Sequence, residues 1–243
     1  MATVQDIKRR LRSVRNTRKI TKAMELVAAA KLRRAEARIA ALRPYAERMT
    51  ELMIGTARAT PSRGFPLLEE RESVGAVAIL PLTGDRGLAG AFNGQILRRA
   101  LQLEREVRAG GADVRWVVVG KKGRSTLRFR RYTIERAWVD FTDRPGYADA
   151  VAIARTLADL FVEREVDRVV IVYNHYVSPL TQTVVVEDAL PIPRTLLEEE
   201  EKSAYEIALE GDFIYEPEPE QILERLLPTY LQTTVFRALL EST

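Results

Sequence analysis

A helical repeat in the first 57 residues constrains the fold more than any other feature of this chain. Positions alternately three and four residues apart form a heptad seam, and twelve of the fifteen are apolar. The seam comprises Val4, Ile7, Leu11, Val14, Arg18, Thr21, Glu25, Ala28, Leu32, Ala35, Ile39, Leu42, Ala46, Met49 and Met53. No glycine occurs before Gly55. A helix over residues 4–54 would be about 75 Å long, so we expect it to project from a domain of this size.

The seam has two irregularities. Arg18, Thr21 and Glu25 are its three polar positions and follow one another along it. Pro44 lacks a backbone donor, which predicts a kink or a short break at that point.

A helix with an apolar seam needs a partner, because it is unstable alone. One interpretation is a coiled-coil dimerisation arm. Another is an antiparallel pair with residues 219–242, which carry leucine, isoleucine and valine at helical spacing but are less than half as long. Pro219 suits the first position of a helix, and Pro228 indicates a kink.

Charge is divided unevenly along the chain. Residues 1–48 hold 14 basic and 4 acidic residues and carry a charge of +10, whereas the rest of the chain carries −6. Such a basic arm predicts an acidic partner, for which nucleic acid, anionic lipid and an acidic protein surface are all candidates.

Composition excludes several classes of function. The 243-residue chain has no cysteine and one histidine, His175, so it has no disulfide, thiolate zinc site, iron–sulfur cluster or cysteine nucleophile. We expect His175 to be a surface or hydrogen-bonded residue. No apolar run approaches the roughly 20 residues that span a bilayer, and the N-terminus is not a secretory signal. A cytoplasmic, non-secreted protein is the simplest interpretation.

The middle of the chain predicts an α/β domain with a mostly parallel sheet and one antiparallel edge strand. We expect strands at 74–81, 114–119, 132–139, 168–176 and 182–187, and helices at 93–109, 122–129 and 147–163. Residues 58–73 and 194–220 are charged connectors. The expected division is a coiled-coil helix (1–57), an α/β foot domain (74–193), a connector (194–218) and the start of a C-terminal coiled-coil helix (219–243).

Two glycine-containing loops follow predicted strands, where phosphate sites occur. The first has Gly84, Asp85, Arg86, Gly87 and Gly90, followed by Asn93, which we expect to cap a helix. Neither this loop nor the Gly-Lys-Lys-Gly turn at 120–123 matches a nucleotide-binding motif. Asp85 would also repel phosphate. We therefore interpret the first as a structural loop and the second as a solvated basic turn.

No nucleophile, base and orienting group occur together in the sequence. Asp140, Asp143 and Asp149 lie in a turn-rich segment, where we expect them to cap helices rather than bind a metal. The residues alone predict a non-catalytic protein without a cofactor or a metal.

Several segments resemble one known family. Residues 7–35, IKRRLRSVRNTRKITKAMELVAAAKLRRA, closely resemble the N-terminal helix of the γ subunit of F-type ATP synthases. Residues 82–93, LTGDRGLAGAFN, are similar to a segment of that family, from which Gly84 and Ala89 depart. Residues 212–231 and 236–241 are similar to the start of its C-terminal helix. The absence of a cysteine-bearing insertion is typical of the bacterial type.

This resemblance implies the fold and the function. It implies an antiparallel coiled coil of the terminal helices on a Rossmann-like sheet domain. It also implies a rotor shaft that joins a membrane ring of c subunits to a hexagon of α and β subunits, where the nucleotides bind. The expected partners are the α, β and ε subunits and the c ring. The expected location is the cytoplasmic face of the membrane, with membrane contact only through the complex. The family continues for some 40 residues beyond Thr243, so we expect this chain to lack the usual end of the C-terminal helix.

The resemblance also implies contact residues. Those expected to face the acidic lever of β are Lys19, Lys22, Met24, Lys31 and Arg34. Phe213 and Tyr215 correspond to an aromatic segment near ε and the c ring.

Two other classes of protein also use a basic helical arm. A nucleic-acid-binding coiled coil is the main alternative, although the arm has no aromatic residue before Tyr45 to stack on bases. A membrane-surface helix is disfavoured because bases such as Arg18 interrupt the apolar seam.

Overall fold

The computed structural model describes residues 3–58, 64–178, 181–193 and 218–242. The chain divides into two compact units, residues 1–41 and residues 42–243, and each is considered by itself. Helix α1 (Val4–Arg58) runs without interruption through the boundary between them.

The first unit is a single stretch of α1. Its start is held by a capping pair, in which the Thr3 hydroxyl donates to Asp6 Oδ2 at 2.7 Å and accepts from the Asp6 amide at 3.3 Å. The apolar seam is exposed: Val4, Ile7, Leu11 and Val14 each keep between 50 and 70% of their accessible surface.

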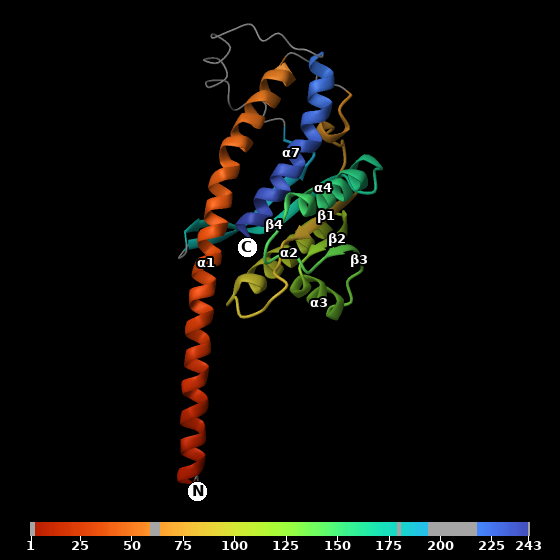
Figure 1. The fold of residues 1–243 in the computed structure, drawn as a ribbon. Helices are drawn as coiled ribbons and strands as arrows, with labels where there is room; N and C mark the ends of the chain where they lie inside the picture. The colour runs from red at the N-terminus through yellow and green to blue at the C-terminus, as the bar shows by residue number, and fades with distance from the viewer. Residues whose placement is uncertain (1–2, 59–63, 179–180, 194–217, 243) are drawn as a thin grey trace. The chain divides into compact units, whose positions relative to one another are not determined.

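The second unit is built on a five-stranded sheet in the order β3-β2-β1-β4-β5 (Figure 1). Its strands are β1 (Ala76–Pro81), β2 (Asp113–Val119), β3 (Ile134–Trp138), β4 (Arg168–Ser178) and β5 (Thr181–Leu190). The first four pair in parallel, and β5 pairs antiparallel with β4. The predicted mostly parallel sheet with one antiparallel edge is therefore confirmed.

Helices cover both faces of this sheet. Helices α2 (Phe92–Ala109) and α3 (Lys121–Phe129) bury one face, around Val77, Ile79 and Trp116. Helices α4 (Tyr147–Val162) and α7 (Pro219–Glu241) bury the other, around Ile171 and Tyr173. Alternation along each strand sends successive side chains to opposite cores. The 3₁₀ turn η1 (Pro66–Leu68) lies in the expected charged connector at 58–73, and it buries Leu67 and Leu68 in the second of these cores.

The end of α1, residues 42–58, belongs to the second unit and runs antiparallel to α7 (Figure 1). Met53 and Ala57 join the core that includes α7, and Met49 Sδ lies 4.0 Å from the Thr233 hydroxyl. The long terminal helices on a Rossmann-like sheet thus agree with the expected fold class.

Three local predictions can be compared with the helices. Pro219 begins α7, as predicted. Neither Pro44 nor Pro228 ends its helix, so the short break expected at Pro44 is wrong. Asn93 does not cap α2, because the helix starts one residue earlier and Ala91 is its N-cap.

Candidate functional site

The arm residues expected to contact a partner all lie on the part of α1 that forms the first unit. Lys19, Lys22, Lys31 and Arg34 are exposed, and Met24 keeps 50% of its accessible surface. At 100° per residue, the five positions spread over roughly 200° of the helix circumference and about 22 Å of its length. They form a broad cationic face with one exposed thioether at its edge, rather than a single pocket.

Lys22 of this face forms an ion pair with a carboxylate of the same helix. Lys22 Nζ lies 2.9 Å from Glu25 Oε1, one turn further along the helix, and both side chains are about two-thirds exposed. Such exposed pairs contribute only about 0–1 kcal/mol, so Lys22 can exchange Glu25 for another carboxylate at little cost.

The loop after β1 is tied to the chain around it by Asp85. The Asp85 carboxylate accepts from the Lys121 amide at 3.0 Å and from the amide and hydroxyl of Thr142 at 3.1 and 2.9 Å. Arg86 forms an ion pair with Asp143 at 3.0 Å. Asn93 Oδ1 accepts from the Gly84 amide at 2.8 Å, so Asn93 closes the loop instead of capping the helix.

The glycines of this region serve close packing. Gly90 has a left-handed φ of +55°, while Gly87 lies against the Lys122 side chain. Gly120 has a φ of +90°, and a Cβ there would lie 2.0 Å from the Thr83 carbonyl oxygen. A side chain would be strained at Gly90 and would have no room at Gly120, whereas at Gly87 it would make ordinary contact with Lys122.

The start of α3 has its amides already bonded. The amides of Lys121, Lys122 and Gly123 donate to Asp85 Oδ1, the Gly84 carbonyl and the Thr83 hydroxyl, respectively. A phosphate at this helix terminus would have to displace all three acceptors. The Gly-Lys-Lys-Gly turn is therefore a packing element against the first loop and not a phosphate cradle.

Asp85 should make the fold sensitive to acid. Burial alone would raise its pKa, but hydrogen bonds from Asp140, Thr142 and Lys121 lower the pKa below its ordinary value of 3.8. The ionised carboxylate thus stabilises the folded state above about pH 4, and this contribution is lost as the pH falls through the lowered folded pKa.

We expect Asp85→Asn to lower the free energy of unfolding by about 1 kcal/mol at pH 7. The difference from the unmodified chain should shrink as the pH falls below 4. Urea unfolding across this pH range measures it, and Asp113→Asn, whose side chain is 83% exposed, is the control. If the loss of stability caused by Asp85→Asn did not change with pH, the ionised Asp85 carboxylate would not have this stabilising role.

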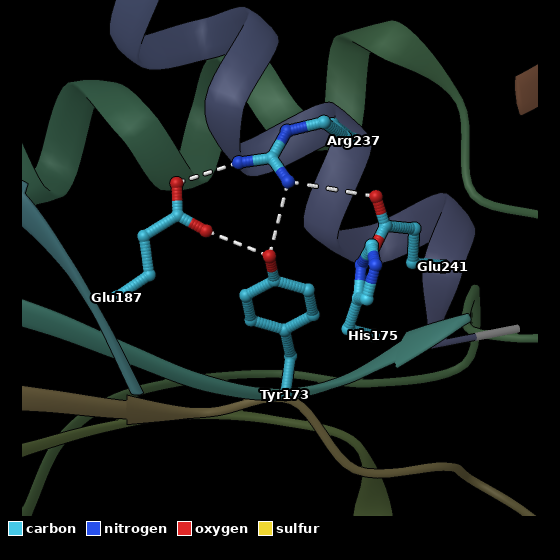
Figure 2. A network of polar contacts seen from close by, with 5 residues as sticks. All are labelled: Tyr173, His175, Glu187, Arg237 and Glu241. Carbon is cyan, nitrogen blue, oxygen red and sulfur yellow. Dashed lines mark hydrogen bonds and ion pairs between the residues drawn. The ribbon is translucent and has the colours of Figure 1, made fainter. Parts of the chain in front are cut away.

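A polar network joins α7 to the sheet (Figure 2). We call it the junction network; it comprises Tyr173, His175, Glu187, Arg237 and Glu241. Arg237 is its centre: Nη2 lies 2.5 Å from Glu187 Oε1, while Nη1 lies 3.0 Å from the Tyr173 hydroxyl and 3.5 Å from Glu241 Oε1. The Tyr173 hydroxyl donates to Glu187 Oε2 at 2.7 Å.

His175 continues the network on its other side. Its Nδ1 lies 2.5 Å from Glu241 Oε2, so the single histidine is a hydrogen-bonded residue, as the sequence suggested. Glu241 is only 6% exposed, and it therefore relies on Arg237 and His175 as partners. The network joins the last turns of α7 to two adjacent strands.

Burial and charge shift the pKa values of two members. Burial is the main reason why the pKa of the Tyr173 hydroxyl is raised; the Arg237 charge opposes the shift, and Glu187 adds to it. Burial alone would lower the pKa of Arg237, but Glu187, Tyr173 and Glu241 together raise it. Tyr173 therefore stays neutral and Arg237 stays charged throughout the physiological range.

Sequence reasoning found one member of the junction network and missed the others. The available signal was spacing: Arg237 and Glu241 are four apart on a helix, and Tyr173 and His175 are two apart on a strand, so each pair shares a face. Nothing in the sequence indicated that these two faces meet.

Three further expectations concern the aromatic segment, a metal site and a membrane-spanning helix. Phe213 and Tyr215 lie outside the described residues. Within the described ranges, no three histidine or acidic side chains gather to hold a metal ion. None of the helices in these ranges combines the length and the apolarity needed to cross a membrane.

Comparison with known proteins identifies the family. A family model described as ATP synthase matches residues 3–243. The chain is 43% identical to the ATP synthase gamma chain of Rubrobacter xylanophilus over 242 residues, which cover all of this chain and 81% of the relative. It is 41% identical to the ATP synthase gamma chain of Desulforamulus reducens, with the same coverage. The chain belongs to the ATP synthase gamma chain family.

A solved structure has the same fold. The central stalk and c-ring structure of the Tetrahymena thermophila mitochondrial ATP synthase includes a chain that matches with a TM-score of 0.64 and 24% identity, over 92% of each chain. This likeness concerns the fold alone.

Membership of the gamma chain family settles the class of function. The chain is a non-catalytic subunit of ATP synthase and takes the role of the central rotor. The nucleic-acid-binding alternative is not favoured.

Proposed function

We propose that the arm of this gamma chain, residues 4–41 of α1, turns among the α and β subunits and meets acidic side chains of β. The observation that carries the proposal is the exposed cationic face formed by Lys19, Lys22, Lys31 and Arg34, with Met24 at its edge. Exposed ion pairs are weak, so such a face can attract an acidic partner at each angle and still release it.

The α/β unit would be the foot of the rotor. We assign residues 74–193 to this foot, and we infer that it faces the ε subunit and the c ring, with Phe213 and Tyr215 near that contact. In this arrangement the subunit reaches the membrane only through the complex, on its cytoplasmic face. The central-stalk and c-ring setting of the Tetrahymena relative supports this inference.

Rotation of an asymmetric subunit explains how a protein without a catalytic site can drive catalysis. A rotor that offers a different surface to each neighbour favours a different conformation in each, and turning the rotor passes these conformations around the hexagon. The chain supports such a role with a 55-residue helix that has no glycine in its first 50 residues. The junction network would help to keep α7 from slipping on the foot under load.

Reconstitution with the α and β subunits of the same organism tests this function. We expect the chain to yield a complex with cooperative ATP hydrolysis, faster than that of the α and β subunits alone. The triple substitution Lys19→Glu, Lys22→Glu and Arg34→Glu should lower turnover by about tenfold, because three weak attractions become repulsions.

A matched control places the same charge change elsewhere on the arm, with Arg9→Glu, Arg12→Glu and Arg15→Glu. If the chain left assembly and turnover unchanged, the proposed function would be wrong. If both triple variants behaved alike, the contact face would be misplaced, although the function would stand.

A further inference from the structure

The end of α3 carries an exposed basic and aromatic cluster. We call it the basic tip; it comprises Arg128, Phe129, Arg130 and Arg131. All four residues are exposed, and Phe129 keeps 87% of its accessible surface. A phenyl ring this exposed contributes nothing to the core, and its flanking arginines leave it open to contact with a partner.

The backbone holds the basic tip in one shape. Arg131 has a left-handed φ of +64°, where glycine is usual, and its amide donates to the Arg128 carbonyl at 2.9 Å. The next amide, of Tyr132, donates to the Leu127 carbonyl at 3.0 Å, which completes a helix-ending motif. Tyr132 is in turn anchored by its ring against Trp116, at 5.5 Å between centroids. The tip is therefore a preformed surface.

The arginines of the basic tip have no carboxylate partner among the residues that the structure describes. Acidic side chains on α2 and β3, the elements that contact α3, are engaged elsewhere. Glu104 accepts from Arg108 at 3.0 Å and from the Tyr132 hydroxyl at 2.7 Å, and Glu135 pairs with Arg115 at 2.5 Å. Residues 121–131 contain no acidic residue at all. The tip thus presents guanidinium groups that can bind carboxylates from outside.

We propose that the basic tip is a docking surface for a carboxylate-rich segment of another ATP synthase subunit, which also places an apolar side chain against Phe129. The inference rests on the proposed function, since it takes the partner from the assembled complex. Arginine and aromatic residues are enriched in the cores of protein interfaces, whereas lysine is depleted, and the tip has three arginines and no lysine. Guanidinium groups also bind carboxylates in a bidentate, oriented way.

An anionic membrane and a nucleic acid fit the tip less well. Binding to a membrane surface needs a broad apolar face, and the tip has one apolar side chain. Single-stranded nucleic acid needs several stacking rings along a basic groove, and Phe129 is the only ring of the tip. A protein segment that matches one ring and three guanidinium groups is the better fit.

Photo-crosslinking tests the inference in the assembled complex. Phe129 is replaced by the photoreactive analogue p-benzoylphenylalanine, the chain is assembled with the other subunits, and assembly is checked by gel filtration before irradiation. We expect a crosslink to another subunit, at a segment that mass spectrometry shows to be rich in Asp and Glu. Adding Arg128→Glu and Arg130→Glu should lower the yield by about fivefold or more.

The matched control reverses two other exposed arginines, with Arg98→Glu and Arg105→Glu on α2, and should leave the yield unchanged. All these side chains are exposed, so none of the variants removes core packing. An assembled complex that gives no crosslink, an unchanged yield in the tip variant, or a crosslink to lipid or nucleic acid would overturn the inference. A chain that fails to assemble would contradict the proposed function, and the inference with it.

Discussion

Replacing Arg237 by methionine is expected to lower the free energy of unfolding by about 2 kcal/mol. The substitution keeps the packing of the side-chain stem but leaves Glu187 and Glu241 without the cation between them. A fully buried pair that loses one partner costs about 3–5 kcal/mol, and the smaller value applies here because Arg237 is 34% exposed. Urea unfolding at pH 7 measures the change.

Two further variants separate charge from packing. Arg225→Met, at an exposed position of the same helix, should cost less than about 0.5 kcal/mol. Adding Glu187→Gln and Glu241→Gln to Arg237→Met should restore part of the loss, because the unpaired charges are then removed. If the triple variant were as unstable as the sum of its parts, the junction network would not act as a unit.

Gly120→Ala is expected to cost about 3 kcal/mol or more. The new methyl group would lie 2.0 Å from the Thr83 carbonyl oxygen, and the backbone φ of +90° is strained for any L side chain. Relief requires the loop after β1 to move away from α3, which would break the bonds of Thr83 and Asp85 to the start of that helix. Thermal and urea unfolding of the variant measure this cost.

Gly94→Ala is the matched control, because a Cβ there meets nothing within 4 Å and the residue lies in helix α2. It should raise the stability by about 0.5 kcal/mol, since alanine restricts the unfolded chain. Equal effects at the two glycines would contradict the close packing described at Gly120.

Local patterns were sufficient to predict the elements of the fold. The apolar run at 74–81 became β1 at Ala76–Pro81, and Pro219 marked the start of α7 because proline suits the first turn of a helix. Asn93 shows the limit of such rules. Asparagine is a common N-cap residue, and Asn93 lies close to the start of α2. Its side chain accepts from the Gly84 amide instead, and the helix begins one residue before it.

Features that depend on distant residues could not be predicted. Glu187 and Arg237 are 50 positions apart, and Gly120 needs its glycine because of Thr83 on another loop. Sequence spacing gives the face on which a residue lies, but not the element that covers that face. The arm residues, such as Lys19 and Arg34, remain predictions because their partner is another chain.

The two edge strands of the sheet, β3 and β5, affect how the subunit behaves before it joins the complex. Strand β3 is only five residues long and carries the exposed charges of Glu135 and Arg136, and β5 is followed closely by Pro191 and Pro193. Edge strands that are short, carry charged side chains or are closely followed by proline disfavour pairing with a strand of another molecule. A rotor subunit synthesised ahead of its neighbours is therefore protected against growing into fibrils through the edges of its own sheet.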